Sequence, residues 1–452
     1  MMLTLSEAAR LAGGTLSGDD AEALRVVTDS RSIEAGDLFV ALKGDQFDAH
    51  DYVAQALAQG AVGAIVKQGF TLDDASLIQV EDTRLALGQL AAGWRARFTL
   101  PLVGITGSNG KTTVKEMLGA ILRAHAGHDA VLMTAGNFNN DIGLPLTLLR
   151  LNENHRYAVI EMGMNHPGEL NYLTRLARPD VALVNNALRA HLGGFESLEG
   201  IAEAKAEIFS GLSDTGIAVI NLDDANVELF RSAALGHRLL GFGLKSGDVY
   251  AASHNLGVDG STISMQSPMG SIDVRLPAPG EHNVRNALAA ASVALALDIP
   301  PAAIARGLMG YSGVRGRLHK VVAANGATVI DDTYNANPDS MKAGLEVLSR
   351  MRAPRWFVMG DIGELGPSAP ELHAEVGAAA RDLGIDHLLT LGELSRNAAE
   401  AFGQEAKHFE QIESLLAHLD GHVSPMASVL VKGSRFMRME RIVDHLVGKK
   451  GK

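Results

Sequence analysis

From residue 100 onward, short apolar and β-branched segments alternate with segments whose apolar residues have helical spacing. The strand-like segments include LPLVGIT, YAVIEMG, VALVNN, IAVINL, TVIDDTY, WFVMGD and SVLVKGS. Strands separated by helices need crossover connections, which produce mostly parallel sheets with helices on both faces. We therefore predict an α/β fold. Within it, the polar and alternating segment 246–279 predicts antiparallel strands or a surface extension.

The chain is long enough for several domains. At roughly 100 to 200 residues per domain, 452 residues predict two to four domains, and the pattern favours three. Residues 1–98 have their own strand and helix patterns, which predict a smaller N-terminal α/β domain. A Gly-rich segment at 310–319 precedes a new strand pattern. We therefore expect a central domain of residues 99–314 and a Rossmann-like C-terminal domain of residues 315–452.

Composition excludes several classes of protein and site. With 46% hydrophobic and 20% charged residues, the chain is too apolar to be disordered. It has no cysteine, which excludes disulfides, zinc–thiolate sites, iron–sulfur clusters and thiol nucleophiles. Its 40 basic and 52 acidic residues give a net charge of −12, which argues against nucleic acid as the main partner. Any anionic ligand must therefore be bound by a local cluster of cations.

Neither a membrane span nor a secretory signal is apparent. The apolar run 287–297 contains Ser292 and is far shorter than the ~20 residues that cross a bilayer, so we predict a buried helix. The N-terminal segment MMLTLSEAARLAGG has no basic region ahead of an apolar core. We expect a cytoplasmic protein, and the lack of cysteine fits a reducing compartment.

The segment LPLVGITGSNGKTTVKEMLGAIL combines a strand, a glycine loop and a helix in that order. Residues 100–106 predict the strand, and the helical face is formed by Val114, Met117, Leu118, Ile121 and Leu122. The loop consists of Gly107, Ser108, Asn109, Gly110, Lys111 and Thr112. Such glycines let backbone N–H groups face phosphate oxygens, while the lysine reaches the β/γ-phosphates and the threonine can bind Mg²⁺. The sequence therefore predicts a phosphate-binding (P-loop) mononucleotide domain.

The match is to a variant loop. The common pattern G-x-x-x-x-G-K-[ST] requires glycine at position 105, where this chain has Ile105, and its glycines are at 104 and 107 instead. The simpler alternative is a Gly-rich turn with an exposed lysine.

Lys205 occupies a position in a helical pattern where an apolar residue is expected. In LEGIAEAKAEIFSGL it lies four residues after Ile201 and three before Ile208, on the apolar stripe. Its side chain therefore points toward the core, where burial lowers the pKa of an amine unless it is paired. One alternative is that the alkyl stem extends to the surface. The other is a neutral amine that CO₂ carbamylates, which would turn it into a carboxylate able to bind Mg²⁺.

Two further residues are candidate metal ligands. Glu161 ends the apolar strand pattern YAVIEMG, where an acid has no packing role, and His191 follows VALVNN. Mg²⁺ prefers oxygen ligands, so Thr112, Glu161 and a carbamylated Lys205 suit it better than His191. A loop histidine without a ligand role is the alternative for His191. Ligands of α/β proteins bind at strand ends, which is where both residues lie.

Together these segments resemble the Mur ligase family, the ATP-dependent amide-forming enzymes of peptidoglycan synthesis. The resemblance spans essentially the whole chain. Its later signatures are IEMGMNHPGEL, AHLGGFESLEGIAEAKAEIF, GEHNVRNALAA, GRLH, DDTYNANPDSM and LVKGSR. One departure is Glu196, where the family often has glycine.

Within the family, TDSRSIEAGDLFVALKGDQFDAHDY, NFNNDIGLP and DDTYNANPDSM are most similar to ligases that join D-alanyl-D-alanine to UDP-N-acetylmuramoyl-tripeptide. Ligases that add the third amino acid share TDSR but carry a DNP[RK] motif, which this sequence lacks. Folylpolyglutamate synthetases share the later two domains but usually start close to the phosphate loop. A nucleotide-binding switch that hydrolyses ATP without making a product is the alternative from another class. The proposed metal ligands and asparagines argue against it.

The resemblance implies a role for each motif residue. The adenine of ATP would be bound by Asn283, and its ribose and phosphates would be contacted by Arg317 and Asp332. The phosphates would also be bound by the loop residues Gly107, Ser108, Asn109, Gly110, Lys111, Thr112 and Thr113. For two Mg²⁺ ions, Thr112 and Glu161 would bind one, and Glu161, His191 and carbamylated Lys205 the other, so that Lys111, Glu161, His191 and Lys205 form the catalytic set.

The same resemblance assigns the substrate residues. The UDP part would be bound by Ser30 and Arg31. The muramoyl-peptide would be bound by Asn137, Asn139 and Asn140. The dipeptide and acyl end would be bound by Asn335, Asn337, Lys432, Ser434 and Arg435. A turn-forming role is the alternative for the asparagines. Arg31, Lys111, Arg317, Lys432 and Arg435 would then form the local cation cluster that polyanionic substrates require. We expect a monomer in which the C-terminal domain closes onto the central one.

Overall fold

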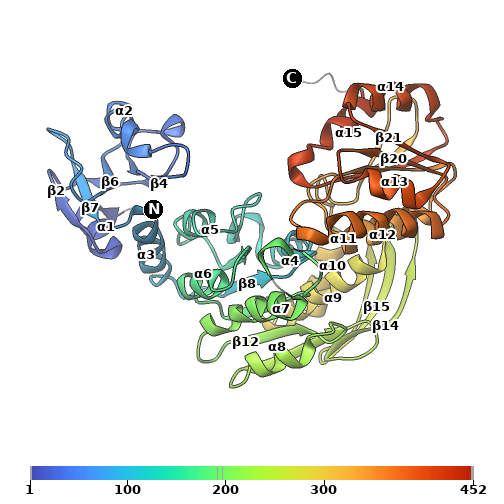
Figure 1. Ribbon diagram of the computed structural model, residues 1–452. Coiled ribbons are helices and arrows are strands. Elements are labelled where there is room, and N and C mark those ends of the chain that lie inside the picture. Colours follow the sequence, from blue (N-terminus) through green and yellow to red (C-terminus); the bar gives the residue numbers. More distant parts are fainter. Residues whose placement is uncertain (1–2, 191, 196, 449–452) are drawn as a thin grey trace.

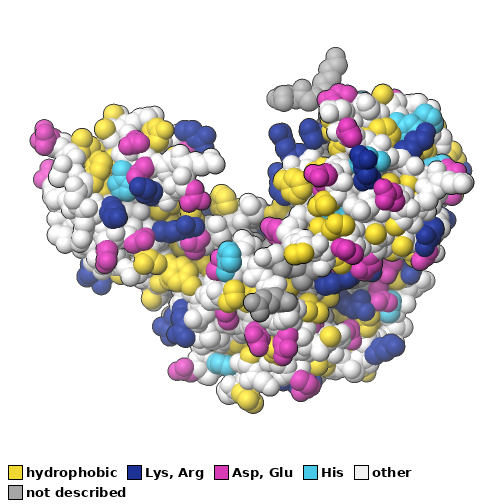
Figure 2. Space-filling view, viewed as in Figure 1, with side chains coloured by type: hydrophobic (Ala, Val, Ile, Leu, Met, Phe, Trp, Pro, Cys, Tyr) yellow, Lys and Arg dark blue, Asp and Glu magenta, His cyan; other side chains and the backbone are white. Residues whose placement is uncertain are grey.

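The computed structural model describes residues 3–190, 192–195 and 197–448 and consists of three α/β units in a row (Figure 1). The N-terminal and C-terminal units lie on opposite sides of the central unit, and a wide hollow separates them (Figure 2). Among the described residues, no helix has both the length and the apolar character needed to span a membrane.

The N-terminal unit is built on a five-stranded sheet in the order β2-β7-β6-β5-β4, in which only β2 is antiparallel to its neighbour. Its strands are β2 (Thr15–Ser17), β4 (Arg25–Val27), β5 (Asp37–Val40), β6 (Gly63–Lys67) and β7 (Leu77–Val80), and β1 (Leu3–Thr4) pairs separately with β3 (Glu22–Ala23). Helices α1 (Leu5–Ala12) and α3 (Thr83–Arg95) pack into one core cluster, and α2 (Val53–Ala58) packs into the other.

Helix α3 joins the N-terminal unit to the central unit. Its N-cap is Asp82, whose side chain accepts hydrogen bonds from the first-turn amides. At its other end, Trp94 Nε1 donates to the Leu151 carbonyl at 3.1 Å. The buried residues of α3 belong to the same hydrophobic cluster as those of α5 (Gly143–Leu148) and α6 (Glu169–Ala177). The core is therefore continuous between the two units.

The central unit contains a nine-stranded sheet in the order β16-β15-β14-β13-β12-β11-β8-β10-β9. Its parallel strands are β8 (Leu102–Thr106), β9 (Val131–Met133), β10 (Tyr157–Glu161), β11 (Val181–Val184), β12 (Ile217–Asn221) and β13 (Arg238–Gly243). Strands β14 (Val249–Leu256), β15 (Ser261–Ser267) and β16 (Gly270–Leu276) pair with one another in antiparallel fashion. This confirms the antiparallel strands predicted for segment 246–279.

Helices cover both faces of this sheet. One face carries α4 (Lys111–Ala126), α9 (Glu281–Ala296) and α10 (Pro301–Met309), and the other carries α5, α6, α7 (Leu198–Ala206) and α8 (Val227–Ala233). The five apolar residues of the predicted face of α4 are fully buried, which confirms that face. Helix α9 is buried along almost its whole length, as the run 287–297 predicts.

The C-terminal unit contains a six-stranded sheet in the order β17-β18-β22-β19-β20-β21, with only β17 antiparallel. Its strands are β17 (His319–Val322), β18 (Thr328–Asp332), β19 (Arg355–Gly360), β20 (His387–Leu391), β21 (Ala406–Phe409) and β22 (Ser428–Lys432). Helices α11 (Pro338–Ser349), α12 (Ala369–Asp382) and α13 (Arg396–Phe402) pack on one face, and α14 (Ile412–His422) and α15 (Glu440–Leu446) pack on the other.

Strand register places three neighbouring strand ends together. Glu161 at the end of β10 pairs with Ile105 of β8, and Val184 at the end of β11 pairs with Thr106 of β8. The carboxyl ends of these parallel strands therefore meet at one edge, and the loops that follow them converge there.

Candidate functional site

A cavity of about 1360 Å³ lies at this edge and is lined by residues of all three units. The N-terminal unit contributes Asp82, Arg84 and Leu85. The central unit contributes the loops after β8, β10 and β11, and the C-terminal unit contributes the loops after β18 and β22 together with α11. A cavity built from several units at the ends of parallel strands is the expected place for a ligand in an α/β protein.

The phosphate loop is held by two asparagines at the end of β11. The amides of Ser108 and Asn109 donate to the Asn186 carbonyl at 3.0 Å and to Asn186 Oδ1 at 2.9 Å. Asn185 Nδ2 donates to the Asn109 carbonyl at 2.9 Å. Sequence reasoning did not assign Asn185 or Asn186, although their place at the end of the VALVNN strand pattern was a usable signal. Their contacts fix the loop that would surround the phosphates.

Glycine is required at position 110 for two reasons. Gly110 has a φ of +80° and is the N-cap of α4, a left-handed conformation that L-residues with a Cβ rarely adopt. A Cβ there would lie 2.4 Å from Asn286 Oδ1 and 2.6 Å from Asn185 Nδ2. The N-terminus of α4 therefore begins directly after the loop, with its free N–H groups and positive dipole end at the cavity.

Lys111 is the first residue of α4, and its ammonium group folds back onto the loop. Its Nζ donates to the Gly107 carbonyl at 2.6 Å. Burial lowers the pKa of Lys111, the nearby Glu161 carboxylate opposes that shift, and the positive charge of Arg317 adds to it. Any anion that enters the cavity would stabilise the positively charged form of Lys111.

Thr112 and Glu161 form a buried pair beside the loop. The Thr112 hydroxyl donates to Glu161 Oε2 at 2.8 Å, and Asn139 Nδ2 donates to Glu161 Oε1 at 2.9 Å. The backbone N–H of Glu161 donates to Thr134 Oγ1 at 2.9 Å, which fixes the end of the strand. Mg²⁺ prefers oxygen ligands such as hydroxyls and carboxylates, so the side chains of Thr112 and Glu161 suit that ion.

Lys205 is buried in α7, with only 1% of its surface exposed. The alternative in which its stem extends to the surface is therefore wrong. Burial lowers the pKa of Lys205 well below its ordinary value, the charge of Lys111 lowers it further, and Asp224 opposes the shift. Asp224 also accepts a hydrogen bond from the Ala187 amide at 2.8 Å. Sequence reasoning missed Asp224.

His191 and Glu196 lie outside the described residues. Within residues 3–190, 192–195 and 197–448, no group of three or more His, Cys, Asp or Glu side chains could hold a metal ion. Of the expected metal ligands, Thr112, Glu161 and Lys205 are therefore the ones that can be described.

The C-terminal unit adds charged residues to the cavity. Lys432 and Asp332 lie at the ends of neighbouring strands β22 and β18, and Lys432 Nζ is 2.7 Å from Asp332 Oδ2. Lys432 Nζ also donates to the Asn335 carbonyl at 2.9 Å. The Arg317 guanidinium lies over the ring of Tyr334, 4.2 Å from its centroid. Asn283 of α9 lines the same cavity from the central unit, and its Nδ2 donates to the Pro279 carbonyl at 2.8 Å.

The asparagines have both structural and cavity-lining positions. Asn140 Oδ1 accepts from the Gly143 amide at 2.9 Å, and Asn337 caps α11 through a capping box with Ser340, so both side chains also hold local backbone. Asn337 does so as a helix cap with an extended backbone rather than in a left-handed turn. Asn337 also bonds Asn109 of the phosphate loop, with Asn337 Nδ2 2.7 Å from Asn109 Oδ1. Asn137, Asn139, Asn140, Asn335 and Asn337 all line the cavity.

Three of the expected substrate residues do not line this cavity. Ser30 and Arg31 are on the N-terminal unit, where Arg31 is exposed and pairs with Asp29 at 2.8 Å. Ser434 is buried, and its hydroxyl accepts from the Gly363 amide at 2.8 Å. Of the five cations expected to form a cluster, Lys111, Arg317, Lys432 and Arg435 line the cavity, and Arg31 does not.

Comparison with known proteins agrees with this geometry. Three family models match consecutive segments: "Mur ligase family, catalytic domain" at residues 25–95, "Mur ligase middle domain" at residues 105–294 and "Mur ligase, glutamate ligase domain" at residues 316–435. A relative from Escherichia coli named UDP-N-acetylmuramoyl-tripeptide--D-alanyl-D-alanine ligase is 43% identical, with 98% of each chain covered. A Bacillus subtilis relative of the same name is 34% identical, again with 98% of each chain covered.

Solved structures give the same result. A crystal structure of MurF from Acinetobacter baumannii covers 99% of both chains at 40% identity, with a TM-score of 0.94. MurF ligase from Thermotoga maritima, solved in complex with ADP, covers 94% of this chain and 97% of its own at 28% identity, with a TM-score of 0.84. On sequence, architecture and site geometry together, this chain belongs to the Mur ligase family.

Proposed function

We propose that this chain is the ATP-dependent, ADP-forming ligase that joins D-alanyl-D-alanine to UDP-N-acetylmuramoyl-tripeptide in peptidoglycan precursor synthesis. The observation that carries the proposal is the assembly of Lys111, Thr112 and Glu161 in one cavity whose walls come from three units. The Escherichia coli relative, 43% identical over nearly the whole chain, is named for this reaction.

The first step activates a carboxylate, which is a poor acyl donor near neutral pH. An oxygen of the terminal tripeptide carboxylate attacks the γ-phosphorus of ATP, the bond to the β,γ-bridging oxygen breaks, and ADP leaves. Two anions must approach each other in this step. Lys111 and the N-terminus of α4 lie where they would offset that repulsion at the β/γ-phosphates.

The second step forms the amide. The free amine of D-alanyl-D-alanine attacks the acyl carbon and loses a proton, and the carbon–oxygen bond to phosphate breaks to release inorganic phosphate. We assign Asn335, Asn337, Lys432, Ser434 and Arg435 to the dipeptide and acyl end, Asn137, Asn139 and Asn140 to the muramoyl-peptide, and Ser30 and Arg31 to the UDP part. The protein's main task is to hold three substrates in reacting geometry.

The nucleotide and metal roles follow the same assignment. Residues Gly107 to Thr113 bind the phosphates, Asn283 the adenine, and Arg317 and Asp332 the ribose and phosphates. Thr112 and Glu161 hold one Mg²⁺, and Glu161, His191 and a carbamylated Lys205 hold a second. A bound Mg²⁺ supplies positive charge beside the reacting anions. The lowered pKa of the buried Lys205 favours the neutral amine that CO₂ requires.

Each unit has a separate task in this proposal. Residues 1–98 bind the UDP-sugar part, residues 99–314 form the ATPase domain, and residues 315–452 close over both. Closure is supported by the position of Lys111 of the central unit and Arg317 of the C-terminal unit, to which nucleotide contacts are assigned, on the walls of the same cavity. We further propose that the chain acts as a cytoplasmic monomer.

The test is phosphate release with ATP and UDP-N-acetylmuramoyl-tripeptide, measured with and without D-alanyl-D-alanine. Phosphate release that depends on both acceptor substrates supports the ligase. Steady hydrolysis of ATP that neither substrate changes would instead identify a nucleotide switch. Release that depends on the tripeptide carrier but is equal with single amino acids and with the dipeptide would identify a ligase of different specificity.

A further inference from the structure

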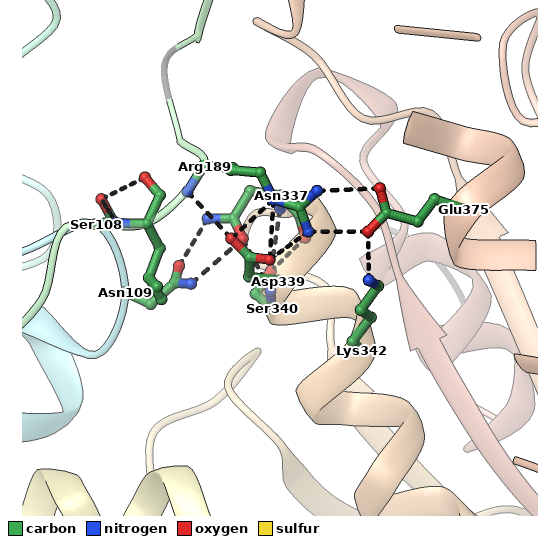
Figure 3. Close-up of polar contacts among 9 residues, drawn as sticks. Ser108, Asn109, Arg189, Asn337, Asp339, Ser340, Lys342 and Glu375 are labelled. Carbon is green, nitrogen blue, oxygen red and sulfur yellow. Dashed lines mark hydrogen bonds and ion pairs between the residues drawn. The ribbon is translucent and has the colours of Figure 1, made fainter. Parts of the chain in front are cut away.

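Arg189 connects the central unit to two helices of the C-terminal unit (Figure 3). It lies in the loop after β11, and its guanidinium contacts Asp339 of α11 with Nη2 2.6 Å from Oδ1. The same guanidinium makes a bidentate pair with Glu375 of α12, with both N–O distances at 3.0 Å. The Arg189 backbone N–H also donates to Asp339 Oδ2 at 3.1 Å. One residue of the central unit thus bonds two elements of its neighbour.

The charges around this guanidinium balance locally. Lys342, one turn along α11 from Asp339, also pairs with Glu375, so two cations face two carboxylates. Arg189, Asp339 and Glu375 are each partly buried, with side chains 30%, 23% and 36% exposed. These pairs hold the pKa of Glu375 at about 2, with the Arg189 hydrogen bond as the main cause. Partial burial and bidentate geometry make such pairs stronger than isolated surface pairs.

The loop that carries Arg189 also holds the phosphate loop. The hydroxyl of Ser108 donates to the Leu188 carbonyl at 2.9 Å and accepts from the Leu188 amide at 2.9 Å. Leu188 directly precedes Arg189, and Asn186 bonds the amides of the phosphate loop. Hydrogen bonds therefore connect Asp339 and Glu375 to Arg189 and connect Leu188 to Ser108, and the peptide bond between Leu188 and Arg189 joins the two sets.

A second link runs in parallel from the same helix. Asn337, the N-cap of α11, bonds Asn109 directly, two residues before Asp339 on the chain. The start of α11 is thus fixed at both the phosphate loop and the Arg189 loop. Any movement of α11 away from the central unit must break both links at once.

We infer that Arg189 is a positioning residue that couples the docking of the C-terminal unit to the conformation of the phosphate loop. Any effect of this coupling on the rate of the ligase reaction rests on the proposed function. The coupling itself concerns only nucleotide binding and the position of the C-terminal unit, so it can be measured without that reaction. Linkage requires that a nucleotide which binds the docked state more tightly also shifts the equilibrium toward docking, and that its apparent affinity falls in proportion to the docked fraction of the free protein.

The first measurement is the distance between the units. Because the chain contains no cysteine, Ala233→Cys on α8 and Ser414→Cys on α14 give two exposed attachment sites for a fluorescent dye pair without background labelling. Single-molecule energy transfer then reports the docked fraction with and without Mg·ADP. We expect Arg189→Ala to shift the docked equilibrium about tenfold toward the separated state.

The second measurement is the affinity for Mg·ADP by calorimetry. Arg189→Ala should weaken binding by the factor by which it lowers the docked fraction of the nucleotide-free protein, although Arg189 is assigned no contact with the nucleotide. The double variant Arg189→Ala/Glu375→Ala should show less than the sum of the two single effects. Arg396→Ala is the matched control, because its pair with Glu410 at 3.1 Å lies within the C-terminal unit. It should leave both docking and affinity unchanged.

The inference is overturned if Arg189→Ala leaves the docked fraction and the affinity as in the parent, or if it lowers thermal stability alone. If Arg189→Ala does not fold, Glu375→Gln keeps the side-chain volume and removes one charge. It should shift docking in the same direction, and an unchanged docked fraction in that variant also overturns the inference. Both measurements use Mg·ADP only, so they stand even if the chain makes no amide from the proposed substrates.

Discussion

Replacement of Gly110 by alanine tests whether the phosphate loop must have the geometry described above. Alanine at a φ of +80° costs about 1–2 kcal/mol of backbone strain. Its Cβ would lie 2.4 Å from Asn286 Oδ1 and 2.6 Å from Asn185 Nδ2, so both of these buried amides, or the loop itself, must move. Loss of the Asn185 bond to the Asn109 carbonyl adds about 1–3 kcal/mol. We expect a total of roughly 2–5 kcal/mol, concentrated in the loop.

Calorimetric titration with Mg·ADP measures the consequence. Gly110→Ala should weaken binding by more than about tenfold, which corresponds to ~1.4 kcal/mol. Gly127→Ala is the matched control, since Gly127 ends the same helix at a φ of +97° and a Cβ added there would have no neighbour within 4 Å. It carries the backbone strain without the clash and should lower thermal stability but retain affinity. Equal losses of affinity in both variants would refute the claim that close packing of Asn185 and Asn286 against Gly110 fixes the phosphate loop.

Three further predictions address the metal ligands and the pH dependence of folding. Lys205→Ala should abolish ligase activity and regain part of it with added short-chain carboxylic acids, whereas Lys115→Ala, at another buried lysine that bonds the Thr134 carbonyl, should show no such rescue. Glu161→Gln should weaken Mg²⁺-dependent nucleotide binding at least about tenfold while its melting temperature stays near that of the parent, as Mg²⁺ titrations would measure. Burial lowers the pKa of His282 to about 4, so the stability it contributes is complete above pH 6.5 and is lost as the pH falls from 6.5 toward 4. Urea unfolding of His282→Gln should therefore show a flatter pH profile across that window.

The parallel architecture was predictable because strand and helix patterns alternate at the level of a few residues. The buried face of α4 could be read directly, since Val114, Met117 and Leu118 follow the period of a helix that packs on a sheet. Glu161 and Lys205 could also be found, because a charged residue at an apolar position of a pattern is a local signal. The structure buries both, with 2% and 1% of their surfaces exposed.

Other features depend on contacts between residues far apart in the chain and gave no local signal. Arg189 bonds residues 150 and 186 positions away, and Asn109 bonds Asn337 across 228 positions. The continuous core between the first two units was equally unpredictable. The sequence of α3 has the pattern of an ordinary amphipathic helix, and only the structure shows that it packs with α5 and α6. Net charge also gave no indication of where cations gather. Among the described residues, seven Lys and Arg side chains line one cavity of this acidic chain, together with ten Asp and Glu side chains.

The central claim is that this chain activates the tripeptide carboxylate by phosphoryl transfer from ATP and then joins it to the dipeptide amine. The most direct test uses UDP-N-acetylmuramoyl-tripeptide labelled with oxygen-18 in its terminal carboxylate, with ATP and D-alanyl-D-alanine, followed by mass spectrometry of the products. One labelled oxygen should appear in the inorganic phosphate, together with ADP and a carrier longer by one dipeptide. Label in AMP, or unlabelled phosphate formed beside the same product, would contradict the account.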